Sequence, residues 1–172
     1  MEAWQNIYYK DEQDVKGESS PIESMAGLGM SVARGTTAVI QGSLTAPQDL
    51  RVLDLYSHNH DHTLRFTIFL KRAGETDRTQ IYESYDWEHP LLLPLDSIHV
   101  NAEGNRDAIA AGGMTGQLDM MTGDALEFEC EIRNDDVEKP LRFANEAHTA
   151  EMCIMRGDYA LSFGKAWASY SM

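Results

Sequence analysis

Apolar and polar residues alternate along much of this chain with a period of two, the pattern of a strand with one buried face. Residues 126–132 show it most clearly, because leucine, phenylalanine, cysteine and isoleucine alternate there with three glutamates. Residues 63–70 predict a second such strand, with Leu64, Phe66 and Ile68 on the side that faces the core. Strands of this kind pack one face on a core and expose the other to water.

Further short strands are predicted between turns that are rich in Gly, Pro, Asn and Asp. These strand candidates are 7–9, 29–33, 38–44, 51–58, 80–85, 117–120, 153–155 and 159–163. Residues 10–27 and 101–116 are expected to be long loops, and 105–114 is either a short helix or part of the second loop. Many short strands with regular turns predict an all-β fold, an antiparallel β-sandwich of jelly-roll type. The length of 172 residues fits a single domain over 1–172.

The charge balance excludes some partners. The chain has 14 basic and 28 acidic residues, a formal net charge of −14. Phosphate backbones and anionic lipid surfaces attract concentrated Lys and Arg, so neither nucleic acid nor an anionic membrane surface is an expected partner. No apolar run approaches the ~18 residues of a membrane-spanning helix, and no signal peptide is visible at the start of the chain.

A cluster of histidines follows the predicted strand 51–58. If the extended conformation continues, His58, His60 and His62 share one face, because side chains at i, i+2 and i+4 do. Two imidazoles ~7 Å apart on a strand can converge on one metal ion. The alternative is a solvated turn that ends the strand. His148 either approaches this arm or lies in a loop, and spacing does not decide between these positions.

The chain has two cysteines, Cys130 and Cys153, which are compatible with one disulfide or with two buried thiols. Met152 precedes the second cysteine. A methionine packed in the core is the ordinary interpretation of such a residue, since the chain has nine methionines.

Four motifs occur in order along the chain: His58-Asn59-His60, Tyr85-Asp86-Trp87, Gly-Asp-Ala-Leu-Glu-Phe-Glu-Cys at 123–130, and Thr-Ala-Glu-Met-Cys at 149–153. This series resembles the C-terminal domain of the copper type II, ascorbate-dependent monooxygenases, the family of peptidylglycine alpha-hydroxylating and dopamine beta-monooxygenase. The resemblance covers nearly the whole chain, from about residue 4 to about 159.

The resemblance implies one copper ion bound by His58, His60 and Met152, at the site where dioxygen and substrate react. It also implies a disulfide between Cys130 and Cys153. Two imidazoles and a thioether suit Cu(I), a soft ion. His62 and His148 are then candidates to support the ligands from outside the coordination shell.

The chain also departs from that family. Those enzymes carry a second copper on a separate N-terminal domain, for which this chain has no room, so whether the chain alone is an enzyme stays open. The favoured function is a copper- and dioxygen-binding domain with ascorbate as electron donor and a second copper-bearing domain as partner. The alternatives are a non-catalytic copper-binding or interaction module, and an acidic β-sandwich without metal. The implied disulfide places the protein outside the cell or in the periplasm.

Overall fold

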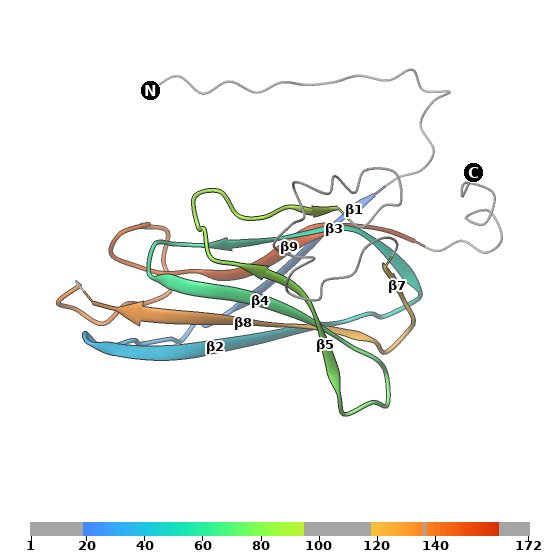
Figure 1. Ribbon diagram of the computed structural model, residues 1–172, viewed down its shortest axis with the longest axis horizontal. Coiled ribbons are helices and arrows are strands. Elements are labelled where there is room, and N and C mark those ends of the chain that lie inside the picture. The colour runs from blue at the N-terminus through green and yellow to red at the C-terminus, as the bar shows by residue number, and fades with distance from the viewer. Residues whose placement is uncertain (1–18, 95–117, 136, 162–172) are drawn as a thin grey trace, which may run out of the picture.

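The computed structural model describes residues 19–94, 118–135 and 137–161. Within these ranges the chain forms two packed antiparallel sheets and no helix (Figure 1). The strands are β1 (Ser20–Ala26), β2 (Thr36–Thr45), β3 (Leu50–Asn59), β4 (Thr63–Lys71), β5 (Arg78–Ser84), β6 (Leu93–Pro94), β7 (Leu118–Met120), β8 (Ala125–Asn134) and β9 (Cys153–Leu161). Among the described residues there is no helix that is long and apolar enough to cross a membrane.

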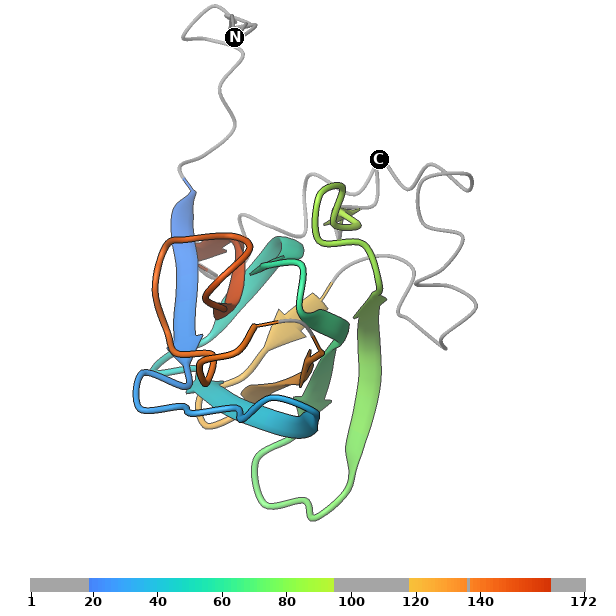
Figure 2. The same cartoon turned by 90° about the vertical axis from the view of Figure 1, so that its left-hand side faces the viewer.

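The two sheets form a β-sandwich whose strands are drawn from both halves of the chain. One sheet has the order β1-β9-β3-β6, with β7 also paired to β3, and the other has the order β2-β8-β4-β5. The links from β2 to β3, from β3 to β4 and from β8 to β9 therefore pass from one sheet to the other (Figure 2). The predicted antiparallel sandwich of jelly-roll type is confirmed.

The core lies between the sheets and is built by the alternation seen in the sequence. Along β8 the apolar residues are buried and the glutamates between them are partly exposed. The Phe128 ring stacks on Phe66, with centroids 5.8 Å apart, and Phe66 meets Tyr82 edge to face at 6.3 Å. Leu64 is 46% exposed, contrary to expectation, because the β4–β8 register shifts between Thr63 and Arg65.

The glutamates of β8 lie on the outer face of the four-stranded sheet, beside basic residues of neighbouring strands. Arg78 lies 2.7 Å from Glu129, and Arg65 lies 3.3 Å from Glu131. Exposed pairs of this kind contribute about 0–1 kcal/mol each. The acidity of this strand is therefore balanced locally by cations on the same surface.

Three predicted elements differ from the structure. β1 lies inside the expected loop 10–27, where Pro21 is tolerated because β1 is an edge strand. Residues 29–33 contribute a single bridge from Val32 to Leu141 and no strand. The two short strands predicted at the end of the chain are one continuous strand, β9. The predictions for 7–9 and 101–116 lie outside the described residues.

Gly157 explains why β9 looked like two strands in the sequence. It sits in mid-strand opposite Leu55, next to the register shift between Val52 and Asp54. A Cβ atom at this position would lie only 2.2 Å from the Asp54 carbonyl oxygen. The glycine therefore allows β9 to pass close to the β3 backbone, where any side chain would collide with a main-chain atom.

Gly157→Ala is expected to lower the free energy of unfolding by about 2–3 kcal/mol, because the sheet has to move to admit one methyl group. Urea unfolding followed by circular dichroism measures the change. Gly29→Ala is the matched control, since a Cβ there meets no atom within 4 Å. Equal stability of the two variants would contradict this close approach.

Candidate metal centre

The β3–β4 hairpin carries the histidine cluster at one end of the sandwich. β3 ends at Asn59, and the chain turns through Asp61 and His62 before β4 begins. The turn is closed by the Thr63 N–H, which donates to the His60 carbonyl over 3.2 Å. Asn and Asp favour such turns because their side chains bond locally to the backbone.

His58 and His60 share one face of the chain, with ring centroids 5.9 Å apart and planes inclined at 78°. Ser57 points into the sandwich, where its hydroxyl lies 3.2 Å from the Tyr82 hydroxyl. His58 therefore faces away from the core, opposite Ile154 of β9. The period of two along the strand brings the two imidazoles together, as the spacing predicts.

His60 is held in one orientation by its neighbours. The side chain is buried, and Nδ1 lies 3.1 Å from the Ala150 carbonyl oxygen. A carbonyl oxygen only accepts hydrogen bonds, so Nδ1 carries the proton and donates it. Nε2 of the neutral ring then keeps its lone pair. A metal-binding imidazole has the same arrangement, with one nitrogen bonded to a carbonyl and the other free for the ion.

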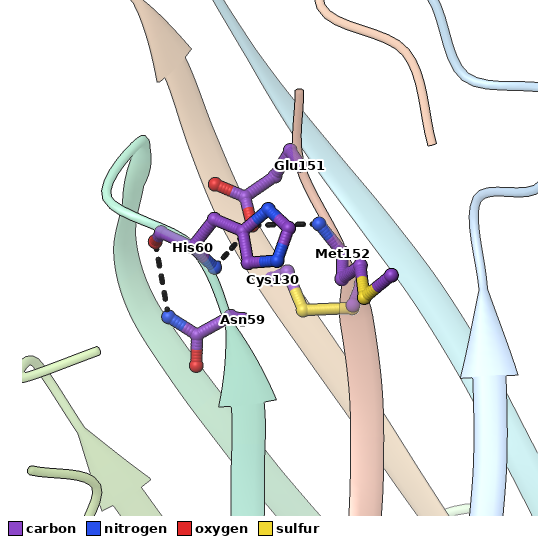
Figure 3. The surroundings of a disulfide bond; sticks show 6 residues. Asn59, His60, Cys130, Glu151 and Met152 are labelled. Carbon is purple, nitrogen blue, oxygen red and sulfur yellow. Dashed lines mark hydrogen bonds between the residues drawn. A yellow bond between two sulfur atoms is a disulfide. The ribbon is translucent and has the colours of Figure 1, made fainter. Parts of the chain in front are cut away.

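Met152 lies immediately before β9 and close to His60 in the fold. Figure 3 shows His60, Glu151 and Met152 grouped above the Cys130–Cys153 disulfide. The Met152 residue is 8% exposed. Cys153 is the first residue of β9, and its bond to Cys130 of β8 joins the two sheets at this end of the sandwich. The disulfide implied by the family resemblance is thus present.

The turn takes His62 off the face shared by His58 and His60, so the extended conformation assumed for all three does not continue. His62 Nε2 donates to the His148 carbonyl oxygen over 3.1 Å. His148 Nδ1 in turn donates to Asp61 Oδ2 over 2.6 Å. His148 therefore does approach the histidine hairpin, and its ring pairs with an aspartate of the turn.

The surroundings of His58 favour its uncharged form. Burial lowers the pKa of His58, and the positive charge of Arg156 acts in the same direction, against a smaller effect of Glu23. The Arg156 guanidinium is itself paired to Glu23 at 3.0 Å. A lowered pKa leaves the imidazole neutral over a wider pH range, and the neutral form is the one that binds metals.

Glu151 is a functional candidate to which the sequence patterns assign no role, although it belongs to the Thr-Ala-Glu-Met-Cys motif. The residue is fully buried, and its Oε1 accepts hydrogen bonds from the His60 N–H at 2.5 Å and the Met152 N–H at 2.8 Å. Burial raises the pKa of the Glu151 carboxyl, and the two N–H bonds oppose that rise. The sequence contains one sign of this role: Glu151 directly precedes the apolar run Met-Cys-Ile-Met, so its charge is expected to lie at a buried position.

The side chains present fit a soft metal ion better than a hard one. Among the described residues no three His, Cys, Asp or Glu side chains are grouped so that they could hold a metal. The donor set at this end instead combines two imidazoles, one with its Nε2 lone pair free, with a nearby thioether. Imidazole and thioether donors suit Cu(I), whereas Mg²⁺ and Ca²⁺ require oxygen ligands.

No protein-family model matches the chain, and no curated protein matches it.

Glu151→Gln is expected to change how stability depends on pH in the metal-free protein. A raised pKa means that the folded chain holds this proton more tightly than the unfolded one. The resulting stability is fully present below the ordinary value of 4.5 and is lost as pH rises through the folded pKa. Glutamine has no such proton, so the stability of the variant relative to the parent should increase from pH 4.5 to 7.5.

Urea unfolding at several pH values tests this expectation. Glu138→Gln, at an exposed position, is the control, and its stability difference from the parent should stay constant over the same range. A Glu151→Gln difference that is equally constant would argue against the effect of burial.

Proposed function

We propose that this chain is the mononuclear copper- and dioxygen-binding domain of a copper monooxygenase-like protein, with His58, His60 and Met152 as the copper ligands. The hydrogen bond from His60 Nδ1 to the Ala150 carbonyl is the observation that carries the proposal. It leaves Nε2 free for a metal, and it joins the histidine hairpin to the segment that contains Met152. The resemblance of four ordered motifs to the copper monooxygenases supports the same assignment.

The residues around the site have definable roles in this proposal. His58 and His60 bind as neutral imidazoles, and Met152 adds the thioether that favours the reduced ion. A bound Cu(I) ion would supply one electron and a coordination position for dioxygen. The chain's own part is to hold the donors in place: Ala150 orients His60, and the disulfide at Cys153 anchors the strand that follows Met152.

Hydroxylation by dioxygen takes two electrons from outside the substrate, and one copper ion provides one of them. A second copper-bearing domain, in the same protein or in a partner, therefore provides the other electron, with ascorbate as the reductant. The disulfide supports an oxidising compartment, extracellular or periplasmic.

Anaerobic titration of the purified chain with Cu(I) is the experiment that tests the copper site. The expected result is about one ion per chain, with a sulfur ligand visible by X-ray absorption. Absence of binding, or coordination by oxygen alone, would refute the assignment. With copper and ascorbate, the chain alone should reduce oxygen only slowly and form no hydroxylated product, because it supplies one of the two electrons. Product in proportion to the oxygen consumed would remove the need for a second copper-bearing domain.

A further inference from the structure

Glu151 lies where the pairing of β3 with β9 ends. The last pair of that ladder is Asn59 with Cys153, and the next pair in sequence would be His60 with Met152. These two residues do not continue the ladder. Both of their N–H groups donate instead to one oxygen, Oε1 of Glu151, over 2.5 and 2.8 Å. A single carboxylate therefore takes over the role of the missing ladder bonds at this point (Figure 3).

The carboxylate is itself well anchored. The Glu151 N–H donates to the Arg142 carbonyl over 3.0 Å, and the residue forms a bridge with Phe143. Its side chain is fully buried, and Oε2 makes no hydrogen bond among the described residues. The two hydrogen bonds from main-chain N–H groups to this side chain therefore both end on Oε1, from His60 and from Met152.

We propose that Glu151 is a positioning residue that sets the separation of the His60 and Met152 side chains by bridging their backbone N–H groups. This inference rests on the proposed copper function, in which those two residues are ligands. Because both N–H groups donate to the same buried oxygen, the bridge restricts both main chains at once. Without it, the His60–Ala150 hydrogen bond and the last β3–β9 pair still join the two segments, but the His60 and Met152 main chains lose their common acceptor. The thioether and the imidazole then meet one ion less well.

The test compares Glu151→Ala, which removes the acceptor, with Glu151→Gln, whose side-chain carbonyl keeps it. Cu(I) affinity of the full chain is expected to fall about 10–100-fold in Glu151→Ala, the range for groups that orient metal ligands, and to change little in Glu151→Gln. The sulfur contribution to X-ray absorption should weaken only in the alanine variant. Rescue by glutamine separates positioning from a requirement for charge.

Asp124→Ala is the matched control for lost stability. Asp124 is another buried carboxylate that accepts backbone N–H groups, from Ala73 at 2.8 Å and Met121 at 3.0 Å, at the opposite end of the sandwich. It should destabilise the chain and leave Cu(I) affinity unchanged. If Glu151→Ala keeps the parent's affinity and sulfur signal, or if Asp124→Ala loses as much, the positioning role is refuted.

A copper-free measurement distinguishes failure of this inference from failure of the proposed function. In the metal-free parent and in Glu151→Gln, the amide protons of His60 and Met152 should exchange slowly and resonate downfield by NMR. Both signatures should disappear in Glu151→Ala. If the parent binds no copper, the proposed function fails, and these amide signals alone decide whether Glu151 holds the two main chains together. Fast exchange in the parent would overturn the bridge itself.

Discussion

His60→Ala is expected to lower the affinity of the chain for Cu(I) by about a hundredfold or more. Replacing a group that only orients a ligand costs metal sites about 10–100-fold, and removing the ligand itself costs at least as much. His60 is buried beside Met152, and its Nδ1 is bonded to Ala150, so its Nε2 is the ring nitrogen available to the ion. His58→Ala should have an effect of the same order. Competition with a chromophoric Cu(I) chelator measures both affinities.

The chain offers matched controls for these variants. His89→Ala removes an imidazole whose side chain is 83% exposed, and it should leave the affinity unchanged. His62→Ala should have an effect of only a few-fold, because His62 Nε2 is engaged by the His148 carbonyl. Met152→Ile should weaken Cu(I) more than Cu(II), since the thioether favours the softer ion. The assignment of these copper ligands is refuted if His58→Ala, His60→Ala and Met152→Ile all keep the parent's affinity.

The double variant Cys130→Ala, Cys153→Ala is expected to lose about 3 kcal/mol of unfolding free energy. The disulfide closes a loop with a sequence separation of 23 and joins β8 to β9 across the two sheets. Its removal returns chain entropy to the unfolded state, and loops of this length correspond to about 3 kcal/mol. Urea unfolding of the parent, with and without reductant, and of the double variant measures the loss.

The same variant should also bind Cu(I) less tightly, because Cys153 directly follows Met152 and anchors the start of β9. Thiol titration of the denatured, unreduced parent is the control and should find no free thiol. Two free thiols in that titration would refute the bond in solution. A double variant with unchanged copper affinity would separate the disulfide from the metal site.

Local periodicity was sufficient to predict most of the strands. The alternation along β8 and along β4 from Phe66 onward depends only on neighbouring residues, and the apolar side chains that it assigns to the core are buried there as expected. Periodicity was not sufficient where contact with a distant segment decides whether a residue lies in a strand. Gly157 looks like a strand break in isolation, whereas in the fold it admits the Asp54 carbonyl of another strand. Pro21 looks like loop until β1 is seen at a sheet edge.

In the candidate site, too, some features follow from local sequence and others only from long-range contacts. The pairing of His58 and His60 on one face follows from spacing along a single strand, so the sequence predicts it. The departure of His62 depends on the turn that links the two sheets, and the contact of His148 with Asp61 crosses 87 residues of chain. Neither follows from a local pattern, because both depend on contact between the hairpin and the distant segment that precedes β9.

The sequence by itself determined the all-β class, the strand that presents His58 and His60, and the residue types that suit a soft metal ion. These depend on local properties: a two-residue period and the chemistry of imidazole and thioether. Only the tertiary structure brought Ala150 and Glu151 to His60, because the pairing of β3 with β9 within one sheet places segments 91 residues apart side by side. The physical reason is that hydrogen bonds of buried groups are satisfied by whatever the packing places beside them.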